Sequence, residues 1–169
     1  MDYKMRLSID GMGIVLFSAE TMSYVCEGTD FMMTEFMQAE HIAEHINKGD
    51  ITGFCTGSGG DFDMHFLSGS PEAGIEQQYP ISAKLGLEVK GGSIQFCDLF
   101  WLTKWDTNFP EDQIIKMPSG FYEVTIFTKC PESGYWGEDQ TILIYFNKVD
   151  KLPELSWTNV PYLYTEDEN

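Results

Sequence analysis

The sequence predicts a mainly β domain of the α+β class, built as an antiparallel β-sandwich or a curled sheet with one packed amphipathic helix. Three observations predict this class. Several short segments alternate apolar and polar residues or are rich in β-branched residues, glycine-containing turns separate them, and one longer segment has apolar residues at helical spacing. No repeat, low-complexity tract or Pro- and Ser-rich linker divides the chain, so we expect residues 1–169 to form one domain.

The N-terminal third predicts two strands and the helix. Residues 3–9 alternate apolar and polar side chains, Gly11-Met12-Gly13 forms a turn, and residues 14–17 are expected to return as the second strand of a hairpin. A helix is expected at about residues 34–48, entered after Asp30 or Thr34. Its apolar side chains share one face, and Gly49 suits the position that ends a helix.

Further strands are expected in the middle of the chain. Residues 51–56 lead into the flexible glycine-rich turn 57–60, and residues 62–67 follow. Residues 81–89 and 93–96 flank Gly91-Gly92, where positive φ at both glycines suits a tight hairpin.

The C-terminal part predicts one more hairpin and a buried strand. A short helix is expected at residues 98–105, followed by a hairpin of residues 113–117 and 121–128. Residues 141–146 are continuously apolar or β-branched, which is typical of a central strand covered on both faces. Residues 165–169 are expected to fray.

Charge excludes some classes of partner. The chain has 27 Asp and Glu against 10 Lys and Arg, a formal net charge of −17. Such a field repels phosphate backbones and anionic lipid surfaces, so neither direct nucleic-acid binding nor membrane binding is expected. It attracts basic proteins and speeds their encounter. Acidity also keeps a protein soluble, and composition alone favours neither interpretation.

The compartment is inferred from targeting signals and cysteines. No stretch approaches the ~20 apolar residues that span a bilayer, and the N-terminus lacks the features of a signal peptide. The four cysteines lie far apart without a Cys-x-x-Cys pair: Cys26, Cys55, Cys97 and Cys130. We therefore expect a cytoplasmic protein with buried, reduced thiols.

Two segments match catalytic patterns in part. His41-Ile42-Ala43-Glu44-His45 matches the inverted zinc-protease motif, but a helical wheel places both histidines opposite the apolar face, toward solvent. Cys55 lies in a Gly-x-Cys-x-Gly segment like a nucleophile elbow, but a strand is expected where the elbow needs a helix. A metal-dependent or cysteine hydrolase using His41, His45 or Cys55 is therefore the alternative function. No catalytic residue, metal or cofactor is predicted.

Residues 131–140 carry the strongest signal for a partner. Tyr135 and Trp136 lie in a glycine-containing loop between strands, bracketed by the carboxylates of Glu132, Glu138 and Asp139. Tyr and Trp are enriched at binding hot spots, and loops on a rigid scaffold commonly bind partners. The alternative, that Trp136 folds back onto the end of the sheet, is equally open.

A second acidic loop, residues 106–112, ends in Glu111 and Asp112. We predict these two residues as further partner contacts on the same surface. The sequence does not place the two loops relative to each other.

Two groups of segments resemble a bacterial family of β-rich proteins without an assigned activity. The resemblance covers most of the chain and implies no catalytic residues. Its residues are Asp30-Phe31-Met32-Met33, Ala39-Glu40-His41-Ile42-Ala43, Gly49, Gly53-Phe54-Cys55-Thr56-Gly57-Ser58, Ser119-Gly120-Phe121-Tyr122, Pro131-Glu132-Ser133-Gly134 and Asp139-Gln140.

In size, acidity and lack of a catalytic motif, the chain is also similar to immunity proteins that neutralise toxins of contact-dependent and type VI secretion systems. That similarity is one of character, without a shared motif. The resulting prediction is a non-enzymatic, acidic inhibitor that binds a cognate, basic protein toxin directly.

Overall fold

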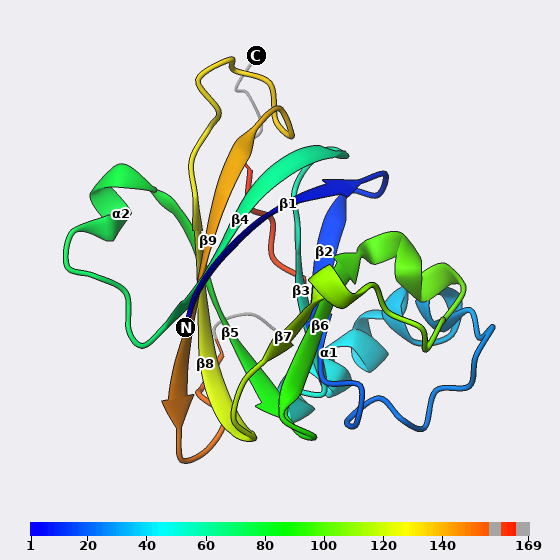
Figure 1. Cartoon of the computed structure of the whole chain (residues 1–169). Coiled ribbons are helices and arrows are strands. Elements are labelled where there is room, and N and C mark those ends of the chain that lie inside the picture. The colour runs from blue at the N-terminus through cyan, green and yellow to red at the C-terminus, as the bar shows by residue number, and fades with distance from the viewer. Residues whose placement is uncertain (156–159, 165–169) are drawn as a thin grey trace.

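Two β-sheets packed face to face form the centre of the computed structural model, which describes residues 1–155 and 160–164 (Figure 1). The five-stranded sheet has the order β1-β4-β9-β8-β5, and the four-stranded sheet has the order β3-β2-β6-β7. All neighbours are antiparallel except β4 and β9. The strands of the first sheet are β1 (Asp2–Ile9), β4 (Gly60–Ser68), β9 (Gln140–Val149), β8 (Gly120–Thr128) and β5 (Ile81–Val89). Those of the second are β3 (Ile51–Cys55), β2 (Gly13–Phe17), β6 (Ser93–Asp98) and β7 (Ile114–Lys116).

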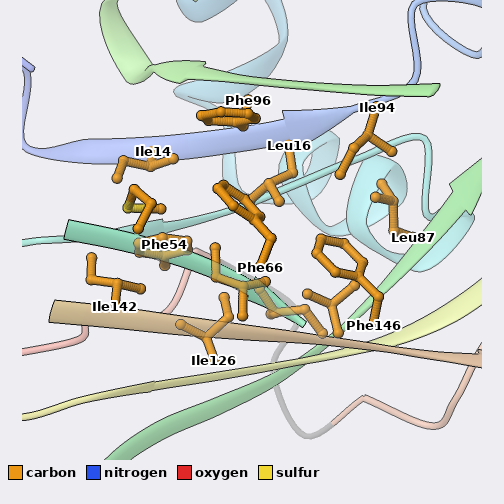
Figure 2. Close-up of a cluster of buried hydrophobic side chains, with 14 of the residues drawn as sticks. Ile14, Leu16, Phe54, Phe66, Leu87, Ile94, Phe96, Ile126, Ile142 and Phe146 are labelled. Carbon is orange, nitrogen blue, oxygen red and sulfur yellow. The ribbon is translucent and has the colours of Figure 1, made fainter. Parts of the chain in front are cut away.

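The main core lies between the two sheets. Figure 2 shows Leu16 and Phe96 of the four-stranded sheet facing Phe66 and Phe146 of the five-stranded sheet. The rings of Phe66 and Phe96 are 4.6 Å apart between their centroids, so they join the sheets directly. The predicted mainly β fold is therefore confirmed, and of its two forms the chain adopts the sandwich.

Helical segments pack on the outer face of each sheet, over only part of the five-stranded one. On the four-stranded sheet, the helix α1 (Ala39–Lys48) packs with Val15 and Phe17, whereas Ile14 and Leu16 of the same strand face the sandwich core. On the five-stranded sheet, the short helix α2 (Ile75–Gln78) places Ile75 among three side chains of β8 and β9, namely Phe127, Leu143 and Tyr145. The prediction that residues 141–146 form a central, doubly covered strand is confirmed, because β9 is the middle strand of its sheet.

The predicted helix is shorter than expected. It ends at Gly49 in the left-handed conformation (φ 69°), as predicted, but α1 begins only at Ala39. A π-helical turn, η1 (Met32–Phe36), precedes it, and the extended backbone of Gln38 (φ −107°, ψ 117°) separates the two. Phe36 before this break and Ile42 after it belong to the same apolar cluster.

The other predicted short helix is confirmed as a 3₁₀ segment, η2 (Leu99–Thr103), and a further turn of this kind, η3 (Glu111–Gln113), leads into β7. No helix of the described residues is long and apolar enough to cross a membrane. The expectation that residues 165–169 fray concerns a segment outside the described residues.

The three predicted hairpins are wrong, although their turns are present. At Gly91 and Gly92 both φ values are positive (67° and 76°), as predicted, but β5 and β6 lie in different sheets. The same is true of β1 and β2, and of β7 and β8. A turn reverses the chain locally, whereas the sheet that a strand joins depends on which of its faces must be buried. Most of β2 and β6 is buried, because helices cover the second face of their sheet.

Candidate partner-binding surface

The loop between β8 and β9, residues 129–139, is anchored by Gln140. The Gln140 side chain is 1% exposed, its amide nitrogen donates to Thr128 Oγ1 (3.0 Å), and its amide oxygen accepts the N–H of Gly137 (3.2 Å). Inside the loop, the N–H of Gly134 donates to the carbonyl of Pro131, and that of Glu138 to the carbonyl of Tyr135. These bonds give the loop a fixed shape although it lies at one end of the sandwich (Figure 1).

The glycine-rich segment 57–60, predicted as a flexible turn, supports this loop. The N–H of Asp61 donates to the carbonyl of Gly137 (2.7 Å), and Ser58 Oγ donates to the carbonyl of Trp136 (2.7 Å). A side chain on Gly60 or Gly137 would collide with the backbone of the other segment. Glycine is therefore required here for two backbones to touch.

The loop holds the two predicted aromatic residues differently. Tyr135 is 73% exposed, whereas Trp136 is partly buried and packs edge-on against Tyr164, with 6.4 Å between ring centroids. Both sequence-based alternatives for this pair are thus realised in part. Tyr135 projects into solvent, and Trp136 folds back.

The chain segment 160–164 contributes further aromatic residues that the sequence analysis missed. Cys55 N–H donates to the carbonyl of Pro161 (2.8 Å), and Leu163 N–H donates to the carbonyl of Cys55 (2.9 Å). This pairing buries Leu163 and leaves Tyr162 63% exposed, with its ring 5.4 Å from that of Tyr164. We refer to Tyr135, Trp136, Tyr162 and Tyr164 as the aromatic tip. Their grouping depends on a contact between distant segments, which no local pattern reveals.

Charged groups lie beside the aromatic tip. Arg6 of β1 contacts Asp139 (2.5 Å) and Asp61 (3.2 Å), and all three side chains are about half exposed. The Ser8 hydroxyl and the Arg6 guanidinium hold the pKa of Asp61 below its usual value, and Asp61 together with Asp139 raises the pKa of Arg6. With Tyr135 and Trp136, these groups line an open hollow of about 420 Å³.

The remaining predicted partner residues fall into two places. Glu132 and Glu138 are exposed on the loop of the aromatic tip. Glu111 and Asp112 are also exposed, but they lie beside the start of β1, where Tyr3 OH donates to the carbonyl of Asp112 (3.3 Å). Figure 1 shows the β8–β9 loop well separated from the entry to β7. Between the two acidic loops, both fully described, no hydrogen bond or ion pair is formed.

His45 lies inside the structure, contrary to the prediction that both histidines point to solvent. It is 8% exposed, its Nδ1 is 3.1 Å from both carboxylate oxygens of Asp50, and it packs against Phe31. The hydrogen bond with Asp50 raises the pKa of His45 against the opposing effect of burial. The helical wheel failed here because η1 and the turn at Asp50 cover a face of α1 that a wheel treats as solvent.

His41 is partly buried, and its Nδ1 lies 3.3 Å from Glu35. Across residues 1–155 and 160–164, no group of three His, Cys, Asp or Glu side chains is arranged to hold a metal ion. The paired histidines of the zinc-protease pattern are thus engaged with carboxylates of neighbouring segments.

The cysteines are reduced and differ in burial. Only Cys97 is fully buried, Cys55 is half-buried, and Cys26 and Cys130 are exposed, which corrects the expectation that the thiols are buried. Burial raises the pKa of the Cys55 thiol, which keeps it protonated near neutral pH. This is the opposite of what a nucleophilic cysteine needs.

Comparison with known proteins yields likeness of fold only. No protein-family model and no curated protein matches the chain, so the family resemblance of segments 30–58 and 119–140 receives no support from these comparisons. Among solved structures, "Crocagin biosynthetic gene J" matches 86% of this chain and 96% of its own with a TM-score of 0.55 at 14% identity. ComJ from Bacillus subtilis, described as an inhibitor of the DNA degrading activity of NucA, matches 88% of this chain and 98% of its own with a TM-score of 0.49 at 15% identity. The chain therefore shares the overall fold of the first of these proteins.

Proposed function

We propose that this protein is an immunity protein that neutralises a cognate, basic bacterial toxin in the cytoplasm by binding it directly through the aromatic tip. The observation that carries the proposal is the exposure of Tyr135 (73%) and Tyr162 (63%) on a firmly held support at one end of the sandwich. Single exposed aromatic side chains are common, but a group of them on one surface is typical of sites that bind a protein partner.

Geometry favours a protein partner over a small ligand. The hollow beside Tyr135 and Trp136 is open, and Tyr135 projects outward rather than into an enclosed cavity. Ligand sites for small molecules are usually concave and largely apolar. An aromatic centre with a charged rim is the usual arrangement of a protein interface.

Charge favours a basic partner. Glu132, Glu138 and Asp139 surround the aromatic tip in a chain with a net charge of −17. Their field accelerates association with a cationic surface, and the tyrosines then contribute the desolvated contact area. By this proposal, the toxin is inhibited because its active-site cleft is covered.

The alternative hydrolase has less support. It requires an accessible His41–His45 pair or an activated Cys55, whereas His45 is buried against Asp50 and burial raises the pKa of Cys55. Stoichiometric zinc in the purified protein would favour that alternative.

An affinity pull-down from the native host tests the proposal. The tagged chain should retain one basic protein stoichiometrically at low salt and more weakly at moderate salt, and that protein should be toxic when expressed alone. Absence of a retained protein at either salt concentration would contradict the proposal.

A further inference from the structure

Each sheet of a sandwich has two edge strands, and here three of the four edges are partly covered or short. At β5, the N–H of Glu88 donates to the carbonyl of Gly49 (2.6 Å), and Leu152 lies against Gly86. At β3, the segment 161–163 pairs with Cys55. The third of these edges, β7, has only three residues. The remaining edge is β1, which has 8 residues and, among residues 1–155 and 160–164, pairs with β4 alone.

The hydrogen-bond phase of β1 shows which backbone groups face outward. Ser68 N–H donates to the carbonyl of Met1, so Met1 and Ser68 form a hydrogen-bonded pair. Because such pairs alternate along an antiparallel ladder, the odd residues of β1 bond to β4 and the even residues point their N–H and C=O groups away from it. The even residues are Asp2, Lys4, Arg6 and Ser8, all of them exposed.

The two sides of this open edge differ in chemistry. On the inner side, between β1 and β7, an open groove of about 380 Å³ is lined by Tyr3, Ile114 and Ile115, among others. On the outer side, the carboxylates exceed the cations Lys4 and Arg6. These carboxylates are Asp2, Asp61, Asp63 and Asp139.

Side chains of β1 contact both acidic loops. Tyr3, near the start of β1, contacts Asp112, and Arg6, further along the strand, contacts Asp139 of the loop that carries the aromatic tip. A chain lying along β1 would therefore run between both groups of predicted partner residues.

We propose that β1 accepts an extended segment of the protein partner as a sixth strand of the five-stranded sheet. The segment alternates apolar side chains, which enter the groove beside Tyr3, with basic side chains, which face the outer carboxylates. Strand addition derives affinity from backbone hydrogen bonds and specificity from alternate side chains. The inference rests on the proposed function for the nature of the partner, and adds how that partner is recognised.

A second copy of the chain fits the edge less well than a basic partner. If two β1 strands paired antiparallel over residues 2–8, Lys4 of each copy would stand opposite Arg6 of the other. Like charges directly opposite each other destabilise a strand pair, and charged side chains on an edge are a common protection against self-association.

The test uses the full chain and a synthetic eight-residue peptide that alternates Lys or Arg with Val. We expect the peptide to slow amide hydrogen exchange at Lys4 and Arg6, whose N–H groups bond to no other described residue, with little change at the odd residues of β1, whose N–H groups are already bonded. The variant Lys4→Pro removes one outward N–H, and Lys4→Ala removes the same side chain but keeps the N–H.

Lys4→Pro should weaken peptide binding by about tenfold, the effect of a lost backbone hydrogen bond, and Lys4→Ala should leave it equal or slightly tighter. A basic peptide held only by the general acidity of the chain would bind both variants equally and protect no β1 amide, which would overturn the inference. Sedimentation of the chain alone that showed a dimer lost in Lys4→Pro would overturn it in favour of a second copy.

The two proposals fail separately. A toxin that lost binding to aromatic-tip variants but bound Lys4→Pro normally would leave the inhibitor function intact and remove strand addition.

Discussion

Gly60 of β4 and Gly137 of the β8–β9 loop lie so close that neither position has room for a side chain. A Cβ atom on either residue would collide with backbone atoms of the other segment. This contact, together with the hydrogen bond from Asp61 to Gly137, holds the loop that presents Tyr135. The exposed aromatic residues therefore depend on a match between two glycine-containing segments far apart in sequence.

Gly60→Ala should displace the loop and reduce stability. Alanine at a positive φ lowers the free energy of unfolding by about 1–2 kcal/mol, and the collision of its Cβ with the Gly137 backbone lowers it by about 1–3 kcal/mol more. Gly69→Ala is the matched control, because Gly69 also has positive φ (98°) but open space around it. Chemical denaturation measures the free energy of unfolding of both variants. Equal losses of stability would contradict the collision between a Gly60 side chain and the backbone of Gly137.

Tyr135→Ala should weaken binding to the protein partner by about 2 kcal/mol, or roughly thirtyfold, because it removes an aromatic anchor. Tyr24→Ala is the control, since Tyr24 is similarly exposed (58%) but lies near Asp50 on the helical side of the molecule. Titration calorimetry with the partner from the pull-down compares them. An equal effect of both substitutions would argue against the aromatic tip.

Stability should fall as pH rises through the titration of His45. Its pKa is raised in the folded protein by Asp50, so the pair stabilises the fold fully below the ordinary histidine value near 6.5 and loses this contribution above the raised value. Denaturation of the wild type and His45→Gln from pH 5 to pH 9 tests this. The wild type should lose its advantage over the variant with increasing pH, and a constant difference would contradict the prediction.

The four thiols should react with an alkylating reagent in the order of their exposure. Cys26 and Cys130 should react quickly at neutral pH, Cys55 slowly because burial raises its pKa, and Cys97 only on unfolding because burial raises its pKa further. Mass spectrometry of timed samples measures the order. Rapid, selective modification of Cys55 would instead support a cysteine hydrolase.

Part of the candidate site was predictable because its signals are local. Tyr135 is exposed in a glycine-containing loop with carboxylates on both sides, as the sequence indicated. Tyr162 and Tyr164 were not predictable, because they reach the same surface only when the segment 160–164 pairs with Cys55. Glu111 and Asp112 are acidic like the residues of the β8–β9 loop, but they lie beside Tyr3 at the start of β1, away from the aromatic tip.

Residue periodicity and turn chemistry act over a few residues, so the amino-acid sequence alone predicts the secondary structure in outline. Period-two patterns, the helix end at Gly49, the turn at Gly91-Gly92 and the doubly buried strand of residues 141–146 are all present. The assignment of each strand to a sheet, the burial of His45 and the open edge of β1 arise from tertiary packing. These outcomes depend on how apolar faces from the whole chain are covered together, and a turn that reverses the chain looks the same whether it stays within one sheet or crosses to the other.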